Sequence, residues 1–109
     1  MAQPDPEDLK IITLARSARA RAEAAEGAAV RDETGRTYAA APVGLPSLRL
    51  SALQVAVAMA VSSGAREVAA AAVVTEGEPS AAAVAAVRDI GTNAPILVAG
   101  PDGTIRATR

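Results

Sequence analysis

Apolar residues recur every three or four positions between Asp5 and Gly27, a spacing that predicts an amphipathic helix. Asp5 can cap the start of this helix, and Pro6 suits its first position. Gly27 is expected to end it, because glycine is common just after a helix. The residues that form the apolar stripe are Ile11, Leu14, Ala15, Ala18, Ala22 and Ala25.

A β-hairpin is predicted next. Residues 28–31 and 36–40 read as two short strands around the glycine-containing turn 32–35. The following segment, Pro42–Leu50, contains two prolines and a glycine, and we expect it to be a loop. Ser51 and Gln54 then form a capping-box pattern, which predicts a second helix to about Ser63.

The last third of the chain alternates strands and helices. A continuous apolar run such as residues 68–75 is typical of a central strand covered on both faces. A helix over residues 80–90, a strand over 95–99, a turn at 101–103 and a last strand near 104–107 are expected to follow. We describe the order as αββαβαβ. This order predicts an α/β fold, with one three-layer α/β/α domain over residues 1–109 and a mixed five-stranded sheet.

Composition limits the function. Half of the residues are hydrophobic, but they are mostly small and Tyr38 is the only aromatic. Each buried side chain therefore removes little apolar surface from water, which favours burial of further surface against other copies of the chain. A net charge of -1 attracts neither nucleic acid nor an anionic membrane. Apolar stretches are too short to span a bilayer, and the acidic N-terminus lacks the order of a signal peptide. We therefore expect a cytoplasmic protein without nucleic-acid or membrane partners.

The first helix carries three arginines, at positions 16, 19 and 21. They raise the question of a phosphate contact. The acidic residues Glu23 and Glu26 follow them in the same predicted helix, so the preferred interpretation is a solvated face with Arg19 near Glu23.

Four segments together resemble the small homo-oligomeric cytidine deaminases. Residues 14–19 are similar to the first helix of that family, 27–38 to its first hairpin, 60–64 with 73–74 to the end of its second helix and its third strand, and 79–95 to its second zinc-binding segment. The resemblance implies the cytidine deaminase-like α/β/α fold, a zinc cofactor and a homo-oligomer, either a dimer or a tetramer.

The positions that the resemblance assigns to catalysis carry other residues here. The family holds zinc through a Cys or His and two further Cys, and uses a Glu to move protons. These positions fall on Ser51, Leu53, Ser80 and Ala83, and the whole chain contains no Cys and no His. We expect these to be vestigial zinc-site positions, with no zinc cofactor and no catalytic residue.

The substrate side differs as well. The family holds the ribose hydroxyls with Asn and Glu, and the matching positions are Pro42 and Gly44, which offer no side-chain hydrogen bonds. The spacing from Ala15 to Gly27 is also too short for the family's aromatic loop over the pyrimidine. We therefore treat Pro42 and Gly44 as vestigial substrate positions.

Several alternatives remain open. Ser51 and Ser80 are expected to cap their helices, or else the two helix ends bind a small anion such as phosphate. The alanine face of the second helix, Ala52, Ala56 and Ala60 with Met59, contacts either another copy or the protein's own sheet. The favoured function is a catalytically inactive cytidine deaminase-like protein with a structural or interaction role. The alternatives are a nucleoside deaminase-family hydrolase and a nucleotide- or anion-binding sensor.

Overall fold

The computed structural model of the chain describes residues 5–109. Within this range the elements are α1 (Pro6–Ala22), β1 (Glu26–Asp32), β2 (Thr37–Ala40), β3 (Val43–Leu45), β4 (Leu48–Leu50), α2 (Ala52–Ser62), β5 (Val68–Thr75), α3 (Ala81–Ile90), β6 (Ile96–Ala99) and β7 (Ile105–Thr108). The αββαβαβ order is confirmed, with β3 and β4 inserted before α2. The last strand expected near residues 104–107 is confirmed as β7, which the seven-letter order does not include.

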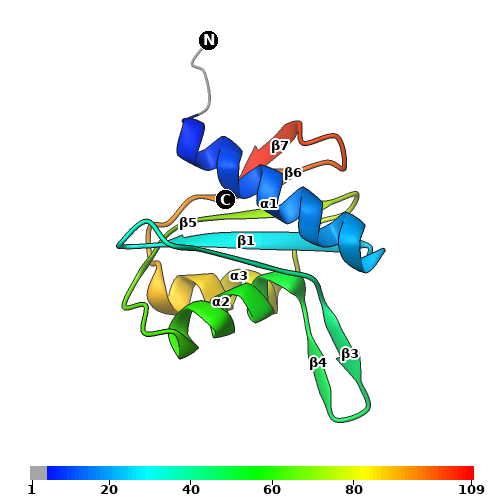
Figure 1. The fold of residues 1–109 in the computed structure, drawn as a ribbon, viewed down its shortest axis with the longest axis horizontal. Coiled ribbons are helices and arrows are strands. Elements are labelled where there is room, and N and C mark those ends of the chain that lie inside the picture. The colour runs from blue at the N-terminus through cyan, green and yellow to red at the C-terminus, as the bar shows by residue number, and fades with distance from the viewer. Residues whose placement is uncertain (1–4) are drawn as a thin grey trace.

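Five strands form one mixed sheet in the order β2-β1-β5-β6-β7. The pair β5 and β6 is parallel, and the other neighbouring pairs are antiparallel. Helix α1 covers one face of the sheet, and α2 and α3 lie side by side on the other face (Figure 1). This arrangement confirms the predicted three-layer α/β/α fold.

Each face of the sheet has its own apolar cluster. Beneath α1 the cluster contains Ile11 and Ile12 with alternate residues of β5, such as Ala72 and Val74. The cluster beneath α2 and α3 contains the intervening residues, such as Val73, together with Leu53, Ala83 and Val87. Alanine and valine supply most of these contacts, so the layers approach closely.

Helix α1 is shorter than predicted. It ends at Ala22, where Glu23 adopts a left-handed conformation with φ 51°, and Gly27 lies inside β1. A Cβ on Gly27 would lie 2.6 Å from the backbone nitrogen of Arg19, because β1 runs directly against α1. Gly27 is therefore required for close packing of strand on helix and does not end the helix.

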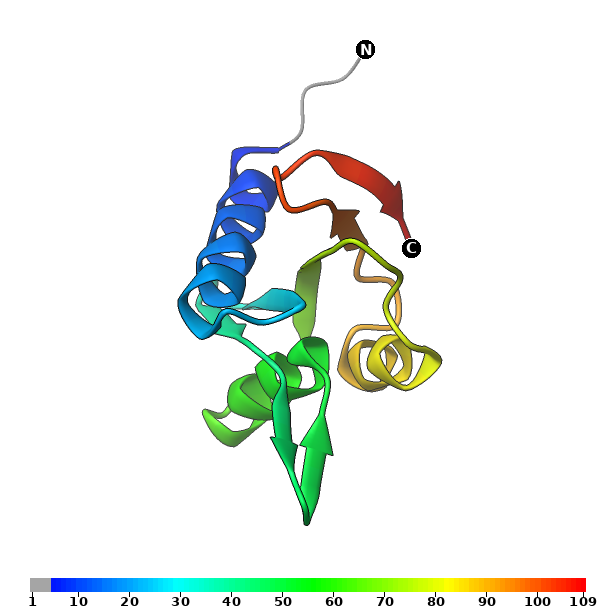
Figure 2. The same cartoon turned by 90° about the vertical axis from the view of Figure 1, so that its right-hand side faces the viewer.

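The predicted loop Pro42–Leu50 is instead a second hairpin, formed by β3 and β4. Pro42 precedes β3, and Pro46 lies in the two-residue connection next to Ser47, so neither proline removes a donor from the ladder. The prediction of a loop was wrong because Pro42 and Pro46 both lie outside the strands, where proline does not interrupt pairing. The hairpin projects away from the three layers, as Figures 1 and 2 show.

The described helices are either too short or too polar to cross a bilayer.

Candidate functional site

The two helices that carry the positions matched by resemblance to the family's zinc site begin at the same end of the sheet (Figures 1 and 2). Ser51 is the N-cap of α2 and Ser80 is the N-cap of α3. Leu53 and Ala83 lie in the first turns of these helices and belong to one buried cluster, with exposures of 1% and 2%. The fold therefore places the first turns of the two helices in one buried cluster at the same end of the sheet.

Both serine hydroxyls accept hydrogen bonds from their own helices. Ser51 Oγ accepts from the backbone N–H of Gln54 at 3.2 Å, and Gln54 Oε1 accepts from the N–H of Ser51 at 2.9 Å, which completes a capping box. Ser80 Oγ accepts from the N–H of Ala83 at 3.1 Å. The predicted capping role of Ser51 and Ser80 is confirmed.

A carboxylate that sequence reasoning placed on the first helix also lies at this end. Glu26 is the first residue of β1, and its Oε2 accepts a hydrogen bond from the N–H of Ala52 at 2.8 Å. A negative side chain at a helix N-terminus interacts favourably with the helix dipole. The Glu26 carboxylate therefore already supplies a negative charge at the start of α2. Its sequence signal was weak, because Glu26 is distant along the chain from α2.

These residues do not fit the zinc ion that the family resemblance implies. A neutral serine hydroxyl is a poor zinc ligand, leucine and alanine have no donor atom, and the Glu26 carboxylate already accepts a backbone hydrogen bond. Among residues 5–109, no group of three or more metal-ligating side chains is placed to hold a metal ion. The donor set therefore lacks the thiolates and imidazoles that a closed zinc site requires.

The two positions matched by resemblance to the family's substrate residues lie at the start of the projecting hairpin. Pro42 is exposed just before β3, and a Cβ added to Gly44 would meet no atom within 4 Å. The connection from α1 to β1 consists of residues 23–25 alone, which is too short to fold over a ligand.

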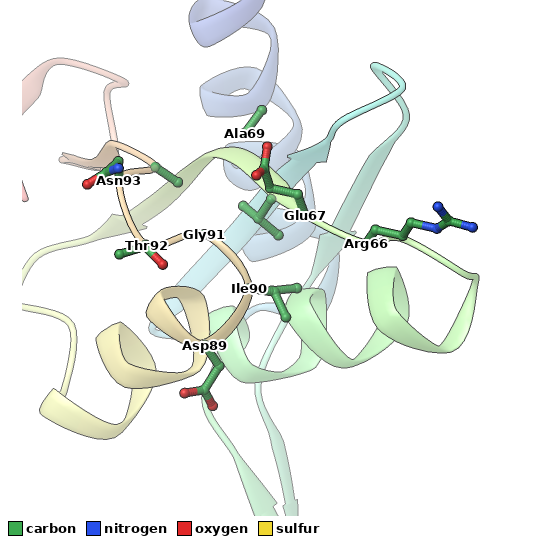
Figure 3. A pocket seen from close by; sticks show the side chains of 10 residues that line it. Arg66, Glu67, Ala69, Asp89, Ile90, Gly91, Thr92 and Asn93 are labelled. Carbon is green, nitrogen blue, oxygen red and sulfur yellow. The ribbon is translucent and has the colours of Figure 1, made fainter.

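A hollow of about 650 Å³ lies at the opposite end of the sheet, between the approach to β5 and the connection from α3 to β6. Its rim carries Arg66, Glu67 and Asp89, and the charged ends of these side chains point in different directions (Figure 3). Val68 and Ile90 supply apolar lining. Because the polar groups do not converge on a common point, this hollow shows no catalytic arrangement.

The strongest perturbation of an acid lies in the turn between β1 and β2. Asp32 is 3% exposed, and hydrogen bonds from the Thr34 hydroxyl and the Tyr38 hydroxyl, with backbone N–H groups of Thr34 and Arg36, lower its pKa to about 2 despite burial. The hydrogen bond to Asp32 raises the pKa of Tyr38 in turn. This network stabilises the predicted turn at residues 32–35 and leaves Asp32 ionised.

Comparison with known proteins identifies the fold and the family. The family model for cytidine deaminase-like proteins matches residues 4–103. The structure of a cytidine deaminase from Burkholderia pseudomallei aligns with a TM-score of 0.79 and 24% identity, covering 92% of this chain and 89% of that chain. A cytidine deaminase from Mycobacterium leprae aligns with a TM-score of 0.73 and 18% identity, covering 94% and 93%. No curated protein sequence matches the chain significantly. The chain belongs to the cytidine deaminase-like family.

Proposed function

We propose that this protein is a catalytically inactive, cytoplasmic member of the cytidine deaminase-like family with a structural or interaction role as a homo-oligomer. One observation carries the proposal. The two helix starts that correspond to the zinc site are closed by their own serine caps and by the Glu26 carboxylate. The positions assigned to catalysis thus contribute to helix stability.

The chemistry of the four positions supports inactivity. Deamination of this class needs a metal-activated water and an acidic group that moves protons to and from the pyrimidine. Leu53 occupies the position of that acid, and it is aliphatic and 1% exposed. Because no single replacement among the four retains a suitable group, loss of activity does not depend on any one of the assignments.

Enzyme assay tests this part of the proposal. The purified protein is incubated with cytidine and added Zn²⁺, and uridine and ammonia are measured, with the Burkholderia pseudomallei cytidine deaminase as the positive control. The expected result is no product above the rate without protein. Turnover that copurifies with this chain and is lost on chelation would contradict the proposal.

The interaction role is supported by two exposed apolar patches. The hairpin patch consists of Leu45 and Leu48, which are 53% and 47% exposed. On α2 the patch is Met59, at 41%, while Val61, at 48%, lies two positions further on and faces another side of the helix. A two-stranded hairpin alone is marginally stable in water, so a partner that covers the hairpin patch would stabilise it. Both patches suit contact with a second copy.

The alanine face does not provide this contact. Ala52, Ala56 and Ala60 are each fully buried against the protein's own sheet, while Met59 from the same predicted face is exposed. The alternative in which these alanines face the sheet is therefore correct. An interface on α2 would use Met59 instead.

Light scattering tests the oligomer. The wild-type protein is expected to elute as a dimer or tetramer at micromolar concentration, and Leu48→Ser or Met59→Ser is expected to shift it toward monomer. Leu9→Ser is the matched control, because Leu9 is 44% exposed on α1, outside both patches. A monomeric wild-type protein would refute the homo-oligomer, and equal effects of all three variants would refute its assignment to the patches.

A further inference from the structure

A second, smaller hollow lies on the α1 face of the sheet, away from the starts of α2 and α3. Its volume is about 290 Å³, and Val74 of β5 lies at its base. One wall is α1, and another is Pro101 in the turn between β6 and β7, which Figure 2 shows beside the helix. The α1 residues that line it are Thr13, Arg16, Ser17, Arg19 and Ala20.

Arg16 is held in place by the β6–β7 turn. Its Nε donates a hydrogen bond to the carbonyl oxygen of Pro101 at 3.1 Å. Gly103 has φ +86°, and a Cβ there would lie 3.1 Å from Cδ of Arg16, so the turn follows the arginine side chain closely. These contacts orient the guanidinium and leave both of its terminal NH₂ groups available.

Arg19 is held by a different segment. Its Nε donates to the carbonyl oxygen of Ala25 at 3.3 Å, in the connection to β1, so the expected contact with Glu23 is replaced by a backbone contact. The last carbonyl groups of α1 already accept backbone hydrogen bonds, so they do not need the arginine side chains as donors. Backbone N–H groups of Glu23 and Ala24 donate to the carbonyls of Ala20 and Arg19, at 3.2 and 3.0 Å.

The two guanidinium groups have no carboxylate within ion-pair distance. The ion pairs of residues 5–109 involve Arg31, Arg106 and Arg109 only. Asp102 is the acid nearest in the chain to Pro101; its pKa is lowered first by the Thr104 N–H and also by the charge of Arg16. Asp102 Oδ1 accepts from Thr104 N–H at 2.9 Å, and Asp102 forms no ion pair with Arg16.

Two like charges three positions apart on a helix repel each other, and an anion between them relieves the repulsion. Arginine presents paired N–H donors that match the oxygens of a phosphate group. The Ser17 hydroxyl lines the same hollow and supplies a further donor. The volume of about 290 Å³ is near the lower limit of small-molecule sites, which suits a small ligand.

We propose that the hollow between α1 and the β6–β7 turn binds the phosphate group of a small phosphate monoester through Arg16 and Arg19. The site is separate from the vestigial zinc site and does not rest on the inactivity proposed above. It assigns a binding role to arginines that the sequence alone indicated as a solvated face.

Titration by NMR tests the site on the full-length protein. Inorganic phosphate and glycerol phosphate are added at low ionic strength, where screening of charge is weak, and glycerol is the uncharged control. Saturable changes are expected at the amides of Thr13 to Ala20, Val74 and Asp102, whose nitrogen follows Pro101. Arg16→Gln and Arg19→Gln are each expected to weaken binding about tenfold, since each removes a charge-assisted contact to phosphate.

Arg21→Gln is the matched control, because Arg21 is exposed on the same helix and does not line the hollow. It is expected to change affinity less than about twofold. Thermal unfolding by circular dichroism verifies that each variant folds, and Arg16→Lys, which keeps the charge, is expected to retain part of the affinity.

The outcomes separate the sources of the phosphate group. Tighter binding of glycerol phosphate than of inorganic phosphate supports a monoester ligand, and equal affinity for both supports recognition of the phosphate group alone. Absence of saturation up to about 20 mM, or an equal loss of affinity in Arg21→Gln, would overturn the proposal.

Discussion

Removing the carboxylate at the start of α2 tests whether Glu26 stabilises this helix start, which the family resemblance matches to a zinc site. Glu26 Oε2 lies 2.8 Å from the N–H of Ala52. Glu26→Gln keeps an oxygen acceptor and removes the charge, so it loses the interaction with the helix dipole, about 0.3–1 kcal/mol. Glu26→Ala also removes the hydrogen bond to a charged group, and its cost rises to about 2 kcal/mol.

Chemical denaturation measures these losses in the free energy of unfolding, and thermal unfolding gives a second measure at about 4–8 °C for each kcal/mol. Glu76→Gln is the control, because Glu76 is an exposed carboxylate just after β5 and makes no hydrogen bond or ion pair in the described structure. A Glu26→Gln variant no less stable than the control would refute the dipole argument. A Glu26→Ala variant more stable than wild type would indicate a carboxylate kept for function at a cost in stability.

Three further predictions follow from the same structure. Ser51→Ala is expected to cost about 1 kcal/mol in chemical denaturation through loss of the α2 cap, while Ser47→Ala at the exposed hairpin tip is expected to change little; equal effects would contradict the capping role. Gly27→Ala is expected to lower the free energy of unfolding by at least about 1–3 kcal/mol, because its Cβ would lie 2.6 Å from a backbone nitrogen of α1. Gly44→Ala is the control, because its Cβ would enter open space, and a Gly27→Ala protein as stable as wild type would show that β1 can move. The pKa of Asp32 falls from 3.8 to about 2 on folding, so its stabilisation is present above about pH 4 and is lost as the pH falls toward 2. The free energies of unfolding of wild type and Asp32→Asn in urea should therefore converge over this range. A constant difference between them would argue against ionisation as the cause.

The sequence predicted the layers and the positions of the two helix starts because both depend on local signals. The apolar run of residues 68–75 indicated the central strand, and the Ser51 and Gln54 pair indicated the start of α2. Where a residue's role depends on a distant segment, the prediction failed. Gly27 reads as a helix end until β1 is packed against α1.

The same limit applied to the site. The sequence shows that Cys and His are absent. The hydrogen bond from the Ala52 N–H to Glu26 could not be predicted in the same way, because 26 positions separate the two residues. The anchoring of Arg16 by Pro101 likewise spans 85 positions, and composition alone favoured a solvated arginine. Long-range contacts of this kind leave no periodic pattern along the chain.

Zinc content together with deaminase turnover of one purified preparation tests the central claim most directly. The protein is loaded with Zn²⁺, desalted, analysed for metal and assayed with cytidine. We expect far less than one zinc per chain and no uridine above background, because Ser51, Leu53, Ser80 and Ala83 lack the required groups. Stoichiometric zinc with turnover of cytidine would contradict it.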